Sequence, residues 1–192
     1  TARELARSTL VAPANLQGRH IGPVVSDIQF GRIQQLIQAG IDEGARLVAG
    51  GLGRPEHLAK GYFVRPTVFS DVHNGMTIAR QEIFGPVLSI IPFDTEEEAI
   101  QIANDTVYGL SNYVQSGDGA RRNRVARRLR SGVVEMNGTP RAPGSPFGGI
   151  KASGRAREGG HWGLEEYLDV KAISGWSQQD QEAADGSPQL PA

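Results

Sequence analysis

Apolar side chains recur every three or four positions between residues 26 and 44, and this spacing is typical of one face of a helix. Ser26, followed three positions later by Gln29, matches a capping box at the start of the stretch, and Gly44 marks its end. The apolar positions are Phe30, Ile33, Leu36, Ile37 and Ile41. We therefore predict an amphipathic helix between Ser26 and Gly44.

Three later stretches also have helical patterns. Thr95 and Glu98 form a second capping box, and Ala99, Ile102 and Ala103 provide an inner face for the helix that follows. Residues 118–130 are rich in arginine and predict a helix whose charged face meets water. A short helix is expected near residues 161–167.

Strand patterns alternate with these helices. They occupy residues 46–50, 62–69, 87–93, 112–115, 132–137 and 168–175. Residues 87–93 are almost continuously apolar, which indicates a strand buried on both faces, as in a parallel sheet. Pro66 interrupts its strand and predicts an edge or a bend. The alternation of strands and helices predicts an α/β fold.

Three segments have no regular pattern. Residues 1–22 contain a loop signal at residues 11–15, and we expect poor order there. Residues 138–154 are rich in glycine and proline, and a connection of this length is usually functional. The polar tail from residue 178 onward has the composition of a disordered segment.

Composition narrows the classes of function. The chain has 192 residues, 39% hydrophobic and 21% charged, with a net charge of -1, so no overall field attracts nucleic acid or an anionic membrane. It has no cysteine, which excludes disulfides, zinc-thiolate sites and a cysteine nucleophile, and which is compatible with the cytoplasmic location that we predict. No apolar run approaches the roughly 20 residues of a membrane span.

Four sequence features bear on chemistry. The segment at residues 144–151 fails as a phosphate-binding loop, because Ile150 stands where lysine must follow glycine. Residues 51–56 do not complete a dinucleotide fingerprint. The arginines of residues 118–130 could bind a polyanion, but a solvated helix face is the better interpretation. The four histidines lack metal-ligand spacing, so no metal site is predicted.

Two blocks resemble signatures of the NAD(P)-dependent aldehyde dehydrogenases. Residues 82–86 resemble the Glu-x-Phe-Gly-Pro block, and residues 146–154 resemble Pro-Phe-Gly-Gly-x-Lys-x-Ser-Gly. Smaller pieces agree in order: Gly22-Pro23, Gly61-Tyr62-Phe63, Pro66-Thr67-Val68, Tyr108-Gly109-Leu110, Gly132-Val133, Asn137, Gly163-Leu164, Tyr167 and Val170-Lys171. The resemblance covers about residues 22–176 and identifies the chain as the C-terminal portion of such an enzyme.

The resemblance also implies a domain organisation. Residues 22–166 would form the C-terminal part of the catalytic domain, a Rossmann-like sheet with flanking helices. Residues 167–176 would form an oligomerisation strand that joins a neighbouring subunit. Residues 1–21 align poorly with the family, and residues 177–192 would form a disordered tail.

The same resemblance assigns roles to three residues. Glu82 would accept hydrogen bonds from the hydroxyls of the nicotinamide ribose, as an acceptor-only carboxylate can. Phe84 would pack beside the nicotinamide ring, and Phe147 would line the aldehyde pocket. The cofactor of the full-length parent would be NAD or NADP, and its substrate an aldehyde that it oxidises to a carboxylic acid.

Departures from the family limit what this chain does alone. The cofactor domain, the catalytic cysteine and the general-base glutamate of the family have no counterpart here. We therefore assign no catalytic residue, and expect no firm cofactor binding and no activity from the isolated chain. The alternative is a naturally truncated homologue that serves as an oligomerisation or interaction module; a polyanion-binding module is a third hypothesis.

Overall fold

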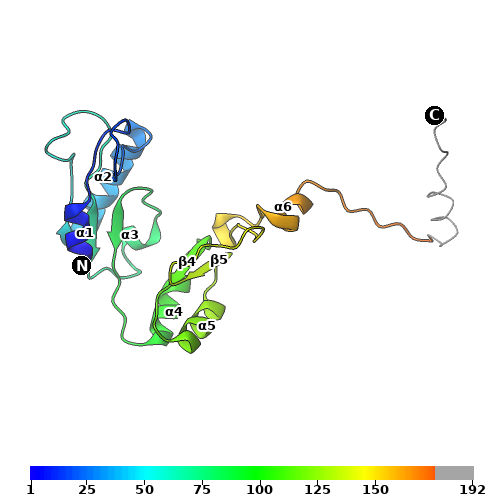
Figure 1. Ribbon diagram of the computed structural model, residues 1–192. Helices are drawn as coiled ribbons and strands as arrows, with labels where there is room; N and C mark the ends of the chain where they lie inside the picture. Colours follow the sequence, from blue (N-terminus) through cyan, green and yellow to red (C-terminus); the bar gives the residue numbers. More distant parts are fainter. Residues whose placement is uncertain (176–192) are drawn as a thin grey trace, which may run out of the picture.

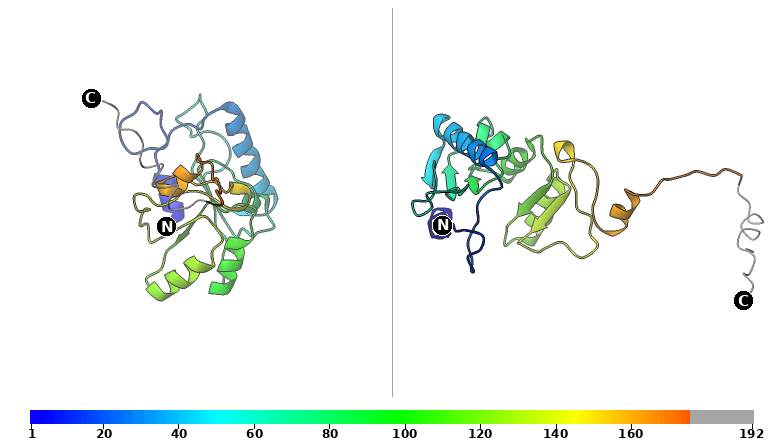
Figure 2. Two further views of the ribbon diagram at one scale, coloured as in Figure 1. Left: turned by 90° about the vertical axis from the view of Figure 1, so that its right-hand side faces the viewer. Right: turned by 90° about the horizontal axis from the view of Figure 1, so that it is seen from above.

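The computed structural model describes residues 1–175, which form two lobes and an extended arm (Figure 1). The first lobe contains α1 (Ala2–Ser8), α2 (Asp27–Asp42), β1 (Arg46–Ala49), β2 (Thr67–Ser70), α3 (Thr77–Arg80) and β3 (Val87–Ser89). The second contains α4 (Glu96–Asn104), β4 (Ser111–Val114), α5 (Gly119–Arg128) and β5 (Val133–Met136). The 3-10 helix η1 (Lys151–Ser153) and α6 (Gly160–Glu165) lead into the arm, which extends away from the body in the right-hand view of Figure 2.

The first lobe is built around a three-stranded mixed sheet. β2 lies in the middle, antiparallel to β1 and parallel to β3. The inner face of α2 packs Ile33 and Ile37, both fully buried, against Phe69 of β2. Burial of such side chains stabilises a fold by roughly 1.5–3 kcal/mol each, so this cluster is the main core of the described chain.

The second lobe is a parallel pair, β4 and β5, packed against α5, which in turn packs against α4. Asp118 caps α5 by accepting hydrogen bonds from the backbone of Ala120 and Arg121. The arginines of α5 face the acidic first turn of α4. Arg124 pairs with Glu96 and Arg128 with Glu97, at 2.7 and 2.6 Å.

These pairs bear on the polyanion hypothesis. Three arginines of α5, including Arg121 at 3.4 Å from Glu96, are engaged with carboxylates of the same chain. Charge that is already matched internally adds little to an attraction for phosphate. The charged face of α5 is therefore better described as solvated and ion-paired with α4 than as a binding site for a polyanion.

The α/β fold class is confirmed, and each predicted stretch other than 62–69, 87–93 and 168–175 contains its helix or strand close to the expected limits. Residues 62–69 were predicted as one strand, but only β2 forms, starting directly after Pro66. Proline lacks a backbone N–H, so it precedes the hydrogen-bonded ladder and is not part of it.

The expectation for residues 87–93 is half right. β3 pairs in parallel with β2, as predicted. It is only three residues long, however, and Leu88 is half exposed while Val87 packs against the core. The second face is open because no element of the described chain lies over it.

Two expectations about the ends of the chain are wrong. Residues 1–22 are not irregular throughout, because α1 forms with a full capping box between Thr1 and Glu4 and packs against β1 and β2. Residues 168–175 form no strand. A strand needs a neighbour for its backbone groups, and the described part of the chain offers none to this arm. The expected disordered tail lies outside the described residues.

Candidate functional site

An open groove of about 680 Å³ runs between the two lobes. The first lobe contributes the end of α3 and the loop that follows it, including Glu82 and Phe84. The second contributes the segment around Gly109 together with Arg130, and Ala152 and Ser153 of η1 complete the lining. This groove brings together two of the three residues that the sequence singled out.

The loop at residues 81–86 is held in place by hydrogen bonds from a residue of α2. The side-chain amide of Gln29 donates to the carbonyl oxygens of Ile83 and Phe84, both at 3.1 Å. Phe84 has a φ of 56°, a left-handed conformation that a non-glycine residue keeps only when its surroundings hold it. A Cβ on Gly85 would lie 2.6 Å from Ile33, so glycine lets the loop approach the helix closely.

A polar clamp ties the same loop to the second lobe. The guanidinium of Arg80 donates to both carboxylate oxygens of Asp105, at 3.0 and 2.7 Å, and to its carbonyl oxygen. Arg80 also donates to the carbonyl of Asn74, whose amide reaches Asp105 at 3.1 Å. Hydrogen bonds from Arg80, and next from Asn74, hold the pKa of Asp105 below its usual value.

Glu82 and Phe84 present their side chains to the groove. Glu82 is exposed, and within residues 1–175 its carboxylate takes part in no hydrogen bond or ion pair. The ring of Phe84 is 73% exposed although its backbone is held in place. A carboxylate with free lone pairs can accept hydrogen bonds from hydroxyl groups. An exposed aromatic ring can stack on another planar ring. These are the chemical properties that the family resemblance requires of the two residues, and their roles stay a prediction.

Phe147 lies apart from this groove. Its backbone forms an isolated antiparallel bridge with Glu158, with hydrogen bonds of 2.8 and 2.7 Å. The guanidinium of Arg141 sits over its ring, 4.6 Å from the centroid, as a cation–π contact does. The groove that contains Glu82 is not lined by Phe147.

In the glycine-rich segment at residues 148–154, polar groups form hydrogen bonds with other parts of the same chain. Ser153 accepts from the backbone of Gly109 at 3.0 Å, and Ile150 donates to the Gly109 carbonyl at 3.0 Å. The ammonium of Lys151 donates to the carbonyls of Asn104 and Thr106, both at 3.0 Å. This lysine caps the C-terminal end of α4, where a cation is favoured, and does not cradle a phosphate.

Sequence reasoning missed the residues that position the loop. Gln29 was interpreted as half of a capping box, but only the Ser26 half forms, with the Gln29 N–H at 3.2 Å. Arg80 and Asp105 carried no motif of their own. One sequence feature could have pointed to Arg80: it lies two positions before Glu82, at the end of the helix that leads into the Glu-x-Phe-Gly-Pro motif.

Metal-binding clusters and membrane-spanning helices are both absent from residues 1–175. No group of three or more histidine, aspartate or glutamate side chains could hold a metal ion in that range. No described helix is long and apolar enough to cross a membrane.

Comparison with known proteins identifies close relatives. The model of the "Aldehyde dehydrogenase family" matches residues 2–173, so the match starts at the N-terminus of this chain rather than near residue 22. A 3-succinoylsemialdehyde-pyridine dehydrogenase from a Pseudomonas species is 49% identical over 175 residues, which is 91% of this chain and 37% of the relative.

Solved structures agree with this match. An aldehyde dehydrogenase from Bartonella henselae has a TM-score of 0.89 and 59% identity, covering 91% of this chain and 37% of that one. A mutant aldehyde dehydrogenase C from Pseudomonas syringae, complexed with NAD+ and octanal, has a TM-score of 0.89 and 48% identity, covering 92% and 36%. The chain spans about a third of the length of the relatives it matches. With a family match over almost all of its described residues, the chain belongs to the aldehyde dehydrogenase family.

Proposed function

We propose that this chain corresponds to the C-terminal portion of an NAD(P)-dependent aldehyde dehydrogenase and contributes the residues that hold the nicotinamide ribose. The observation that carries the proposal is the pair formed by the unpartnered Glu82 carboxylate and the exposed Phe84 ring. They lie on one immobilised loop and line one groove. A structural relative with NAD+ and octanal bound supports the same cofactor and substrate class.

The chemistry of the two side chains differs. Glu82 accepts hydrogen bonds from the ribose hydroxyls and so orients the sugar. Phe84 offers a flat apolar surface that limits where the attached ring lies. When bound, NAD or NADP supplies the hydride acceptor that aldehyde oxidation requires. The fixed backbone of the loop keeps both groups in place without reorganisation.

The substrate side of the proposal rests on Phe147 and the loop at residues 138–146. That loop would line the aldehyde entrance, with Phe147 at the pocket. The contact between Arg141 and Phe147 stiffens this region and directs the guanidinium onto the ring. Arg141 is therefore a poor anchor for an anionic substrate.

The isolated chain would be inactive. Aldehyde oxidation in this family proceeds through a cysteine thiolate, and the sequence contains no cysteine. The two lining residues also leave most of a dinucleotide without contacts. We expect no firm cofactor binding by the chain alone, and assembly with copies of itself through residues 167–176 in a cytoplasmic setting.

One experiment tests cofactor binding. Residues 2–173 replace their matched segment in the Bartonella henselae enzyme, and NADH formation is followed with an aldehyde. Glu82→Gln should raise the KM for NAD+ roughly tenfold, because a charged acceptor is lost, and exposed Glu56→Gln should not. Equal KM values for the two variants would overturn the assignment of Glu82. Turnover by the unmodified isolated chain would overturn its proposed inactivity.

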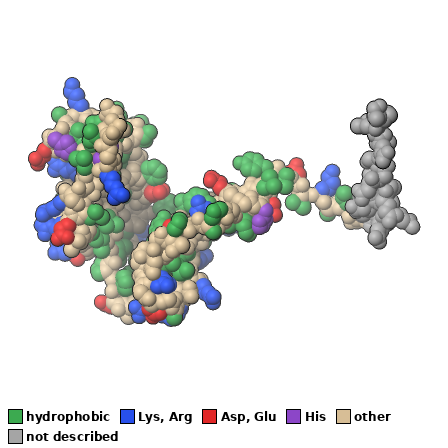
Figure 3. Space-filling model, in the orientation of Figure 1, with side chains coloured by type: hydrophobic (Ala, Val, Ile, Leu, Met, Phe, Trp, Pro, Cys, Tyr) green, Lys and Arg blue, Asp and Glu red, His purple; other side chains and the backbone are tan. Residues whose placement is uncertain are grey.

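A second function is favoured by the arm. Tyr167 is 88% and Val170 99% exposed, and hydrophobic side chains gather along this extension (Figure 3). Such surface suits an interaction module that associates without catalysis. Sedimentation analysis of the isolated chain tests the module: one defined oligomer that dissociates on Val170→Asp supports it, and a monomer or polydisperse aggregates contradict it.

A further inference from the structure

A cluster of hydrogen bonds, the polar clamp described above, joins the two lobes where α3 and α4 end. The guanidinium of Arg80 donates to the carbonyl of Asp105 at 2.8 Å and to both of its carboxylate oxygens. Asn74 donates to the same carboxylate at 3.1 Å and to the carbonyl of Ile102 at 3.0 Å. Arg80 also lines the groove that contains Glu82, so the lobes are tied together at the edge of that groove.

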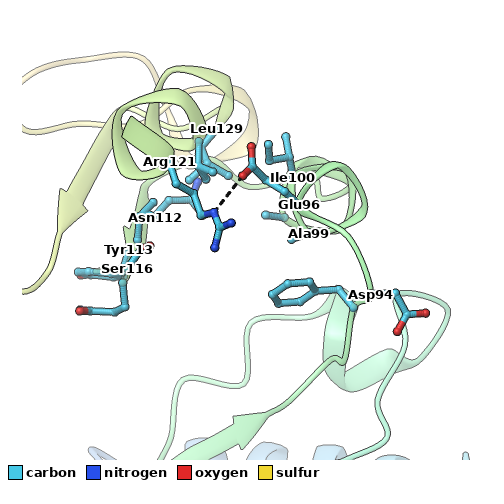
Figure 4. A pocket seen from close by; sticks show the side chains of 14 residues that line it. Asp94, Glu96, Ala99, Ile100, Asn112, Tyr113, Ser116, Arg121 and Leu129 are labelled. Atoms are coloured by element: carbon cyan, nitrogen blue, oxygen red, sulfur yellow. Dashed lines mark ion pairs between the residues drawn. The ribbon is translucent and has the colours of Figure 1, made fainter. Parts of the chain in front are cut away.

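The Arg80–Asp105 pair differs from the other ion pairs of the chain in what it connects. Within residues 1–175 it is the one salt bridge that spans the two lobes, because the others each lie inside a single lobe. Figure 4 shows one of those others, in which Arg121 of α5 reaches Glu96 of α4. A guanidinium that donates two hydrogen bonds to one carboxylate fixes both distance and orientation. The clamp is therefore suited to setting the geometry between the lobes.

On the first lobe, the clamp starts from a firmly held element. Ile78 of α3 is buried in the core. Thr77 donates its backbone N–H and its hydroxyl to the carboxylate of Glu43, at 2.7 and 2.5 Å. One end of α3 is thus attached to the residue that follows α2, and the other end carries Arg80. Glu82 comes two residues after Arg80 and therefore moves with the first lobe.

On the second lobe, the clamp reaches the opposite wall of the groove. Asp105 caps α4, and the carbonyls of the residues on either side of it accept from the ammonium of Lys151, both at 3.0 Å. Lys151 begins η1, which supplies part of the groove lining. The separation between Glu82 and this wall is therefore set by hydrogen bonds that run through Arg80 and Asp105.

We propose that the clamp fixes the width of the groove, and that Arg80 and Asp105 are positioning residues for Glu82. The proposal rests on the proposed function, in which Glu82 holds the nicotinamide ribose. Arg80 and Asp105 act through Glu82 and not by contact with the cofactor. A group displaced by about 1 Å loses much of its effect on a bound ligand, so a broken clamp weakens cofactor binding while Glu82 itself is unchanged.

The width of the groove can be followed in the chain itself. Because the sequence has no cysteine, Arg32→Cys on α2 and Gln101→Cys on α4 place one spin label at an exposed position of each lobe. Pulsed electron paramagnetic resonance then measures the distribution of distances between the two labels. Arg80→Met removes every hydrogen bond from the guanidinium and should widen this distribution roughly twofold. An unchanged distribution would overturn the proposal.

A kinetic measurement links the clamp to Glu82. In the Bartonella henselae enzyme that carries residues 2–173 of this chain, Arg80→Met should raise the KM for NAD+ roughly threefold. A merely structural defect would reduce the amount of folded enzyme, which lowers the apparent kcat and leaves this KM unchanged. Added to Glu82→Ala, Arg80→Met should raise the KM no further, because no acceptor remains to be positioned. Effects that multiply in the double variant would contradict a role through Glu82.

Two further arginine variants make the test specific. Arg80→Lys keeps the charge but loses the two-pronged geometry, so the distance distribution and the KM should both lie between those of the parent and Arg80→Met. These intermediate changes also test the clamp if Arg80→Met does not fold. Arg128→Met breaks a pair with Glu97 that also has two hydrogen bonds and nearly the same exposure, but lies inside the second lobe. It should change neither quantity; an equal response would indicate general loosening and contradict the proposal.

The clamp and the proposed function fail in different ways. If Glu82→Gln raises the KM for NAD+ while Arg80→Met changes neither the distances nor the KM, the proposed function stands and the positioning role is wrong. If Arg80→Met widens the distances while Glu82→Gln leaves the KM unchanged, Glu82 does not hold the cofactor. In that case the proposed function is overturned, and the positioning role with it.

Discussion

The loop at residues 81–86 and the segment at residues 148–154 both carry motifs of the same family, yet they use their polar groups differently. In the first, the backbone is held by Gln29 while the Glu82 side chain is left free. In the second, the side chain of Lys151 is bonded to two carbonyls of its own chain. A motif residue therefore indicates ligand binding only when its polar atoms lack partners inside the protein.

The largest effect should come from the packing of the second segment. A Cβ on Gly132 would overlap the carbonyl oxygen of Gly148, which is backbone and cannot turn aside. We expect Gly132→Ala to lower the free energy of unfolding by roughly 3 kcal/mol, measured by urea denaturation. Gly117→Ala, which meets no atom within 4 Å, is the control. If Gly132→Ala leaves the free energy of unfolding nearly unchanged, the segment at residues 148–154 is not held by close packing against Gly132.

Lys151→Met should have the next largest effect. It removes two charge-assisted hydrogen bonds at the end of α4 and should cost roughly 1.5–3 kcal/mol. Lys151→Arg, which retains the charge, should recover part of this loss. If the methionine variant is as stable as the parent, the lysine is not structural, and the contrast with Glu82 disappears.

Gln29→Ala tests how firmly the first loop is held. Two hydrogen bonds to Ile83 and Phe84 are lost, and the unfolding free energy should fall by about 1 kcal/mol. Amide exchange across residues 82–86 should rise at the same time. Gln35→Ala, at an exposed position of the same helix, should leave that exchange unchanged. Faster exchange in both variants would argue against a specific role of the Gln29 hydrogen bonds.

The clamp beside this loop predicts a pH dependence. The pKa of Asp105 in the folded chain is below its unfolded value, so its contribution to stability is complete above about pH 4 and is lost as the pH falls through the folded pKa. The difference in unfolding free energy between the parent and Asp105→Asn should be at its full size above about pH 4 and should shrink as the pH falls below that value. A difference that stays constant would mean that the ionised clamp contributes nothing.

The smallest effect on stability should come from Glu82→Gln. Its carboxylate has no partner within the described residues, so the unfolding free energy should change by less than about 0.5 kcal/mol. Thermal unfolding of the isolated chain measures this. A clear loss of stability would show that Glu82 is structural like Lys151, and would weaken its assignment to a cofactor.

The sequence predicted local structure well where local signals decide it. Ser26, Thr95 and Asp118 start their helices, and the alternation of elements indicated the α/β class. Long-range partners were not predictable, because nothing near Gln29 indicates that its amide reaches a loop more than fifty residues away. For the same reason, Leu88 was expected to be buried by elements that the described chain does not contain.

For the candidate site, the family resemblance assigned Glu82 and Phe84 to the cofactor; both side chains are exposed, and their roles stay a prediction. Phe147 came from the same resemblance, but its distance from the groove depends on how η1 and α6 pack, which no local pattern encodes. The Arg80–Asp105 clamp joins residues from two lobes and so becomes visible only after folding.

The arm that follows α6 has a consequence for the lifetime of the protein. From Asp169 to Gly175 its backbone forms no hydrogen bond with any other described residue, and Lys171 is exposed. Proteases cleave segments that they can bind in extended form, and this is the shape that the arm already has. Whatever partner covers these residues also shields them from degradation, so assembly and turnover compete for the same stretch of chain.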